Sequence, residues 1–291
     1  MINYARAFGP AISPFPAIKL FAFLLSVLLL GSVAVHAHLG QDEQLSHINF
    51  LIEQRPKEQM LYIKRGAIHT ASSHFQAAAA DFNRAEQLGP AVLVAFDWGV
   101  LYHQMENSTR AIDYYDQYLE QFPDAAHAYE YRARAARDKG DNKEAVADLQ
   151  RYFELLDRPH PGNYIAAARM LNEMQEIEAA LDLLDKGLKK LGAVPQLQRV
   201  AIALERERGD INSAVARLET LRVPLRENPS WKLEMVELLL LDNRTDQATA
   251  LLREVEATLA DLRSTPARQD LLKRSQTLRE STERSVSGPR P

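Results

Sequence analysis

Residues Tyr62–Pro90 read YIKRGAIHTASSHFQAAAADFNRAEQLGP, and this stretch decides the fold of the chain. Apolar residues recur at helical spacing on both sides of Ala71–His74, which predicts two helices joined by a turn. The small residues Gly66, Ala78 and Ala85 fall where two such helices would have to touch closely. Neither helix could bury its apolar face alone, so the hairpin needs neighbours of its own kind.

The hairpin recurs along the chain with a nearly constant period. If Ala78 is taken as an anchor, the equivalent alanines follow at spacings of 33, 34, 35, 34 and 34 residues: Ala111, Ala145, Ala180, Ala214 and Ala248. A bulky residue lies four positions after each anchor: Phe82, Tyr115, Leu149, Leu184, Leu218 and Leu252. A small or β-branched residue lies twelve positions before it: Gly66, Gly99, Ala133, Ala168, Ile202 and Val236. Units that stay in phase in this way predict an all-α stack of about six helical hairpins.

The repeat resembles the tetratricopeptide repeat family over residues 59–262. The first unit carries the family pattern as Tyr62, Gly66, His69, Ala78, Phe82, Ala85 and Pro90, and the second as Trp98, Gly99, Tyr102, Ala111, Tyr115 and Pro123. The resemblance implies an α-solenoid, with the first helix of each unit lining its concave face. Later units depart from the pattern, since Ile202 and Val236 replace the small residue, which leaves the curvature of the C-terminal half open.

Capping helices are predicted at both ends of the stack, because terminal repeats must shield their open faces. Residues 38–58 form the first cap, with an apolar stripe of Leu45, Ile48, Leu51 and Ile52. Residues 263–284 form the second, begun by Thr265 as N-cap and Pro266 in the first turn. Residues 285–291 are expected to be a disordered tail.

Residues 1–37 read as a secretory signal, with two basic residues, an apolar core at 20–30 and a cleavage site after Ala37. The alternative is an uncleaved anchor formed by residues 20–37, a length near the lower limit for a membrane-spanning helix. A periplasmic or secreted location is therefore expected, or an inner-membrane anchored one if the segment is retained. Cleavage would change the net charge from −4 to −6, because the removed segment has two bases and no acid.

Composition and motifs argue against several classes of function. The net charge of −4 argues against a nucleic-acid binder, and the absence of cysteine excludes disulfides and thiolate chemistry. The eight histidines show no zinc-ligand spacing, and the chain has neither a phosphate-binding glycine loop nor a G-x-S-x-G elbow. We therefore expect no enzyme activity, no cofactor and no metal.

The candidate site is a surface on the first helices. By the family resemblance, the residues eleven and eight positions before each anchor point into the groove, with aromatic residues beside them. The predicted groove residues are Phe96, Val100, His103, Tyr131, Arg134, Arg137, Arg169, Asn172 and Arg206, together with Arg199, which lies about two turns before Arg206. Arginine forks suit carboxylates and aromatic rings give rigid contact area, so a peptide with an acidic or free C-terminal end is the expected guest.

A simpler interpretation of the arginines also stands. Arg134 and Arg137 can pair with Glu130 and Asp141 on a merely solvated helix face. The carboxylate clamp best known in the family is absent, since its Lys and Asn positions are Ile63 and Ala67 here.

The leading hypothesis for function is an exported, non-enzymatic scaffold that binds a peptide or partner protein in its groove. The alternatives are a dedicated accessory subunit of an envelope enzyme or of a transport or assembly complex, and a structural role through self-association. The sequence does not identify the partner.

Overall fold

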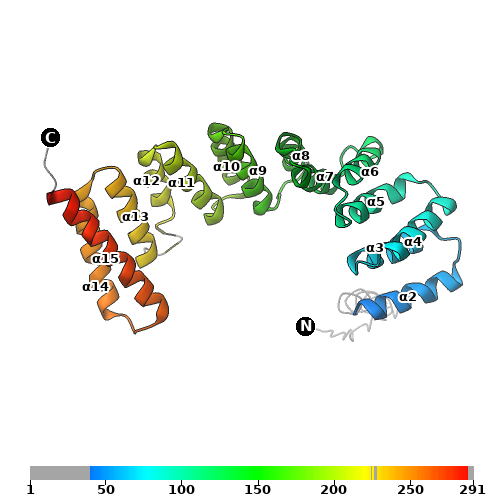
Figure 1. The fold of residues 1–291 in the computed structure, drawn as a ribbon, viewed down its shortest axis with the longest axis horizontal. Coiled ribbons are helices and arrows are strands. Elements are labelled where there is room, and N and C mark those ends of the chain that lie inside the picture. Colours follow the sequence, from blue (N-terminus) through cyan, green and yellow to red (C-terminus); the bar gives the residue numbers. More distant parts are fainter. Residues whose placement is uncertain (1–39, 224, 226–227, 288–291) are drawn as a thin grey trace, which may run out of the picture. The chain divides into compact units, whose positions relative to one another are not determined.

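The structure, a computed structural model, describes residues 40–223, 225 and 228–287. Every regular element in these residues is an α-helix, and the fourteen helices α2–α15 follow one another as hairpins (Figure 1). The predicted all-α repeat fold is therefore confirmed. The predicted leader at 1–37 lies outside the described residues, and so does the end of the predicted tail at 288–291.

The chain divides into two compact units, Met1–Leu101 and Tyr102–Pro291. The helices of the first unit are α2 (Gln41–Gln54), α3 (Gln59–Ala71), α4 (Phe75–Leu88) and most of α5 (Val92–Gln104). The second unit begins within α5 and continues with α6 (Ser108–Gln121), α7 (Ala126–Lys139), α8 (Asn142–Leu155), α9 (Pro161–Glu173), α10 (Ile177–Leu191), α11 (Pro195–Arg208), α12 (Ile211–Thr220), α13 (Pro229–Leu241), α14 (Thr245–Asp261) and α15 (Pro266–Ser287). None of the described helices is long and apolar enough to cross a membrane.

The turn of each hairpin has one residue in the left-handed backbone region. This residue lies five positions before the anchor alanine, with φ between 58° and 91°: Ser73, Glu106, Gly140, Gln175, Gly209 and Asn243. The next amide then reaches back five residues, as Asp141 N does to Ala136 O at 2.9 Å, which satisfies a carbonyl at the end of the first helix. The turn is thus the same in all six hairpins, although glycine occupies the critical position in only two of them.

Glycine at one of the other turns should stabilise the fold. Glu106 is exposed and has φ 58°, a conformation that costs a residue with a Cβ atom more than it costs glycine. We expect Glu106→Gly to raise the free energy of unfolding by about 0.5–1 kcal/mol, measured by urea denaturation. The neighbouring substitution Met105→Gly is the control and should be destabilising, because Met105 has no positive φ to relieve.

The anchors lie where the repeat pattern requires contact between paired helices. Each anchor is the fourth residue of its second helix, and all six have an exposed fraction of 0%. The bulky residues four positions later are also buried, and so are the small or β-branched residues twelve positions earlier. The six anchor alanines therefore lie in the core of the hairpins, as the sequence predicts.

Three arginines tie hairpins to the helix that precedes them. Each donates hydrogen bonds to a buried carboxylate in its own hairpin and to a polar side chain on the preceding helix. The three sets are Arg65 with Asp81 and Asn49, Arg132 with Asp148 and Asp116, and Arg217 with Glu205 and Asp185. They occur in the first, third and fifth hairpins.

Aromatic side chains make contacts at the other junctions, where the first, third and fifth hairpins meet the helix that follows each of them. In the first unit, Phe82 of α4 meets Trp98 of α5 edge to face, with ring centroids 5.3 Å apart. In the second unit, Phe153 of α8 stacks on Tyr164 of α9 at 3.8 Å. Between α12 and α13, the buried Trp231 donates its indole N–H to the carbonyl of Leu218 at 2.9 Å. Polar and aromatic contacts thus both join successive hairpins, and the junction of α6 with α7 has both, since the rings of Tyr115 and Tyr131 lie 6.3 Å apart.

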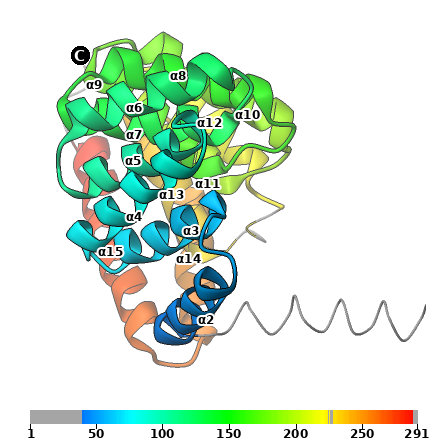
Figure 2. The same ribbon diagram turned by 90° about the vertical axis from the view of Figure 1, so that its right-hand side faces the viewer.

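The ends of the stack carry the expected helices. At the C-terminal end, α15 packs against both α13 and α14 (Figures 1 and 2). Thr265 caps it by accepting a hydrogen bond from the amide of Arg268 at 3.2 Å. Helix α15 continues through Ser287, three residues beyond the predicted end of the second cap at residue 284.

Candidate interaction surface

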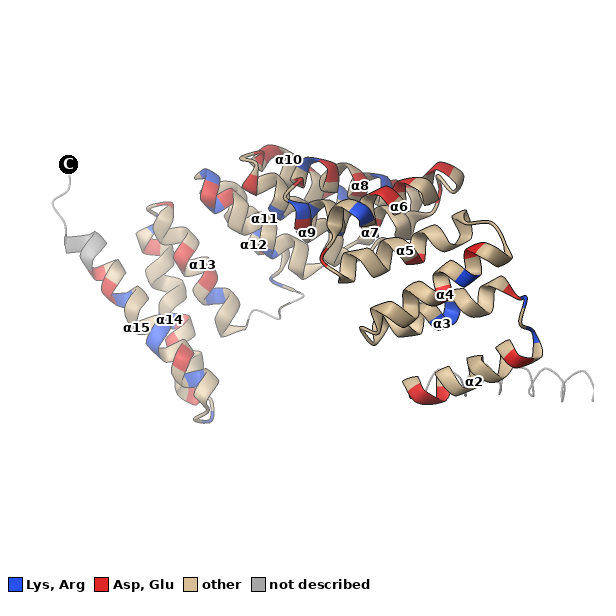
Figure 3. Cartoon of the chain, turned by 45° about the vertical axis from the view of Figure 1, so that its right-hand side comes forward, with Lys and Arg blue, Asp and Glu red and all other residues tan. Residues whose placement is uncertain are grey.

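Most of the predicted groove residues lie on the first helices of the second unit. In this unit α9 and α11, the first helices of consecutive hairpins, contact each other directly. Figure 3 marks basic residues on α7, α9 and α11. We define the first-helix face by the predicted residues of the second unit: His103, Tyr131, Arg134, Arg137, Arg169, Asn172, Arg199 and Arg206. Phe96 and Val100 belong to the first unit, where both are partly buried on α5.

Two arginines of this face are bound to acids on their own helix. Arg134 pairs with Glu130 and lies over the ring of Tyr131, its guanidinium carbon 5.2 Å from the ring centroid. Arg137 binds Asp138 at 3.1 Å. The expected alternative is thus correct for Arg134. Arg137 differs from that interpretation, since it pairs with Asp138, while the side chain of Asp141 caps α8 by accepting a hydrogen bond from the amide of Glu144.

Two hydrogen bonds link first helices of consecutive hairpins across the face. His103 Nε2 lies 2.8 Å from Asp138 Oδ2, and Asn172 donates its amide to Glu207 Oε2 at 3.1 Å. Burial alone would raise the pKa of Asp138, but hydrogen bonds from His103 and Arg137 hold it below its ordinary value. Asp138 therefore stays charged at neutral pH and keeps both partners.

The sequence analysis missed the acidic members of this face. Asp138, Glu173 and Glu207 each lie seven positions before their anchor, directly after a predicted groove position. A comparison of the repeats at the position seven residues before each anchor would have revealed them. Their recurrence shows that the face is mixed in charge and is not a continuous arginine stripe.

The remaining arginines differ in how far they are neutralised. Arg199 approaches Glu234 of α13 at 3.9 Å, the outer limit of an ion pair. Arg169 on α9 and Arg206 on α11 are exposed and have no ion pair with any residue that the structure describes. The positive charge of the face is therefore concentrated at these two side chains. The groove role of all these residues stays a prediction.

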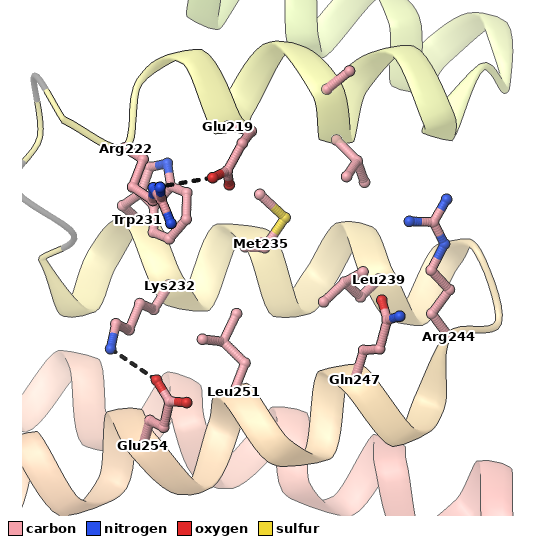
Figure 4. A pocket seen from close by; sticks show the side chains of 12 residues that line it. Glu219, Arg222, Trp231, Lys232, Met235, Leu239, Arg244, Gln247, Leu251 and Glu254 are labelled. Atoms are coloured by element: carbon pink, nitrogen blue, oxygen red, sulfur yellow. Dashed lines mark hydrogen bonds and ion pairs between the residues drawn. The ribbon is translucent and has the colours of Figure 1, made fainter.

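A second concavity lies between α12, α13 and α14 (Figure 4). It has a volume of about 460 Å³, and Trp231, Met235 and Leu239 lie among its lining residues. Charged residues at its rim form ion pairs with one another: Lys232 pairs with Glu254 and Arg222 with Glu219, each at 3.0 Å. A counterpart of about 370 Å³ lies between α8, α9 and α10. The sequence analysis did not single out either cleft, and we interpret both as gaps that the repeat leaves between successive second helices.

An aspartate beside the predicted groove residue Phe96 should make stability depend on pH. Burial raises the pKa of Asp97 to about 6. Because the folded state holds this proton more tightly than the unfolded chain, stability should fall as pH rises from about 4 through about 6. We expect Asp97→Asn to be more stable than the parent by about 2–3 kcal/mol at pH 8 and equal to it near pH 4. Urea denaturation at both pH values measures this, with the exposed Asp113→Asn as control.

Comparison with known proteins supports the assignment of a helical repeat. A family model of the tetratricopeptide repeat matches residues 96–163. The solved C-terminal part of a repeat protein from Cytophaga hutchinsonii superimposes with a TM-score of 0.61 at 13% identity, covering 80% of this chain and 94% of the other. Residues 96–163 match the tetratricopeptide repeat, and the chain shares its fold with a solved tetratricopeptide repeat protein. No curated protein sequence matches it.

Two other solved structures share the fold of this chain. PilW, described as a type IV pilus biogenesis factor, matches with a TM-score of 0.51 at 15% identity, covering 64% of this chain and 86% of PilW. A structure of Naa15/Naa10 bound to HypK-THB matches with a TM-score of 0.55 at 16% identity, covering 91% of this chain and 39% of that one. At such identities the likeness concerns the fold alone. The tetratricopeptide repeat is a protein-interaction fold, and in the described residues no group of three or more His, Asp or Glu side chains could hold a metal ion.

Proposed function

We propose that this protein is an exported, non-enzymatic scaffold that holds a segment of a partner protein along the first-helix face. The observation that carries the proposal is the contact between α9 and α11. It joins the first helices of the fourth and fifth hairpins, on which Arg169, Arg199 and Arg206 are exposed. The bond between His103 and Asp138 likewise links α5 to α7, on which Tyr131 is partly buried. A rigid helical frame of this kind presents side chains to a partner without ordering them anew on binding.

Site-specific cross-linking tests where the partner lies. Ala203 is exposed on α11, eleven positions before its anchor, whereas Ala250 is exposed on the second helix α14. A photo-activatable amino acid at Ala203 should give a discrete adduct of higher mass in cells, and the same probe at Ala250 should not. Adducts of equal yield from both positions, or from Ala250 alone, would show that the first-helix face is not the binding surface.

Export is supported by the apolar core and cleavage pattern of residues 1–37. The N-terminal residue of the protein recovered from the cell envelope tests it. A chain beginning at His38 supports cleavage and a periplasmic or secreted protein. A chain beginning at Met1 in the membrane fraction supports the anchored alternative, and recovery from the cytoplasm contradicts export.

A further inference from the structure

We propose that the N-terminal end of the stack binds an amphipathic helix of another protein in a cleft between α2 and α3. This α2–α3 cleft has a volume of about 320 Å³, and its lining includes Gln44, Ile48 and Leu51 of α2 and Leu61, Lys64 and Ile68 of α3. It is a different surface from the first-helix face. The inference goes beyond the proposed function and rests on one part of it, the cleavage after Ala37.

Helix α2 has the register of a second helix. Gln44 lies 34 positions before the anchor Ala78, and it is the fourth residue of α2, just as each anchor is the fourth residue of its own helix. Its amide donates to the carbonyl of Gly40 at 3.1 Å, as the amide of Ala78 does to that of His74 at 3.0 Å. Helix α2 thus corresponds to half of a hairpin, and the described residues contain no first helix to pair with it.

The stripe of α2 that would face such a first helix lines the cleft instead. In the first hairpin, the anchor Ala78 and the bulky residue Phe82 are covered by α3 and have an exposed fraction of 0%. The equivalent residues of α2 are Gln44, which is partly buried, and Ile48, which is 9% exposed. Leu51, one turn further on, is also only partly buried. A helix laid over this stripe would remove its apolar surface from water.

The exported chain cannot supply that helix itself. Cleavage after Ala37 leaves two residues, His38 and Leu39, before the described residues begin at Gly40. A helix that covers the stripe needs about 11 residues, which is three turns. A second copy of the chain has none to offer, because each first helix in its described residues is followed by its own second helix. The occupant is therefore a helix of a different protein.

The repeats indicate which residues the apolar face of that helix must carry. A small residue is needed where the first helix crosses the bulky position of the second, since a Cβ atom at Gly66 would lie 2.3 Å from Cε1 of Phe82. In three hairpins a tyrosine lies four positions before this small residue: Tyr62 with Gly66, Tyr129 with Ala133, and Tyr164 with Ala168. We expect the same pair in the occupant, with its Gly or Ala over Ile48.

A peptide taken from this chain is a defined probe. It has the sequence of α9, residues 161–173, with both ends capped and a fluorescent label, and it carries Tyr164 and Ala168 at the required spacing. The protein recovered from the cell envelope should bind it, as measured by fluorescence anisotropy. The substitution Ala168→Leu in the peptide should weaken binding about tenfold, because the larger side chain would overlap Ile48. This comparison leaves the protein itself unchanged.

Variants of the protein distinguish the cleft from general apolar adhesion. Leu51→Glu on α2 and Ile68→Glu on α3 should each weaken binding of the peptide about tenfold, since the helix would cover an unpaired carboxylate. The matched control is Phe50→Glu, which changes an apolar residue of α2 that is 57% exposed and lies outside the lining. It should leave binding unchanged.

A cross-link connects the peptide with the natural occupant. A photo-activatable amino acid at His47, an exposed residue that also lines the cleft, should give an adduct in envelope extract. The α9 peptide should abolish this adduct by competition, and its Ala168→Leu form should not. The same probe at Glu53, exposed on α2 outside the lining, should give no adduct.

Three results would overturn the inference: equal binding of the two peptides, unchanged binding by Leu51→Glu and Ile68→Glu, or an adduct from His47 that the peptide does not displace. A recovered chain that begins at Met1 and binds no peptide would also overturn it, because residues 25–37 lie at the spacing of a first helix and would fill the cleft from the same chain. The cross-link from Ala203 tests the first-helix face separately, so the two proposals can fail independently.

Discussion

Arg217→Ala should lower the free energy of unfolding by about 3 kcal/mol, because it leaves a buried carboxylate without its counter-charge. The side chain of Glu205 is 4% exposed and binds Arg217 at 2.8 Å, and its Oε2 atom already has no partner. Arg217 also reaches Asp185 of the preceding hairpin at 2.6 Å. Its loss therefore removes both a buried pair and the polar joint between α10 and the hairpin of α11 and α12.

A compensating variant distinguishes these two effects. Arg217→Met with Glu205→Leu removes the pair but leaves no buried charge, and a well-packed apolar pair of this kind is often close to neutral. We expect the double variant to regain most of the stability in urea denaturation, while hydrogen exchange in α11 and α12 stays faster than in the parent because the link to Asp185 is gone. The matched control Asp185→Ala should cost less than 1 kcal/mol, since its carboxylate is half exposed. A double variant as unstable as Arg217→Ala would contradict the buried-charge explanation.

Gly66→Ala should destabilise the first unit by about 3 kcal/mol, since the new methyl group would overlap a ring that cannot move. A Cβ atom at Gly66 would lie 2.3 Å from Cε1 and 2.7 Å from Cδ1 of Phe82. Phe82 is fully buried and held edge to face against Trp98, so it has no free space to enter. Alanine's better helix propensity contributes only about 1 kcal/mol in the opposite direction.

The repeats themselves supply the control for this prediction. Where the bulky residue is aromatic the small position is glycine, and where it is Leu149 or Leu184 the small position is Ala133 or Ala168. Gly66→Ala combined with Phe82→Leu reproduces that second combination and should recover at least half of the lost stability. Hydrogen exchange in α3 and α4 measures the effect locally. A single variant as stable as the parent would mean that the ring can shift after all.

The regular spacing of the anchor alanines and their equivalent positions explains why so much of the fold could be predicted. Contacts within a hairpin join residues at fixed short separations, and the same separations recur six times, so the pattern identifies the buried positions without reference to distant segments. The contacts of Arg65 and Arg132 with buried carboxylates could also be predicted from the sequence. Arg65 and Asp81 recur 67 residues later as Arg132 and Asp148, a period of two hairpins.

The candidate site was only partly predictable. The sequence alone determined which residues of α7, α9 and α11 carry arginine, and it placed them at equivalent positions of the repeat. Which of those arginines are neutralised was decided only by the tertiary structure: Arg137 binds Asp138 instead of Asp141, and Glu173 binds Asn142 instead of Arg169. Long charged side chains choose among several partners of nearly equal energy, and the choice depends on how consecutive hairpins are aligned. Apolar burial at the anchors determines how each hairpin folds. The packing of one hairpin on the next determines which charged side chains at the surface are paired.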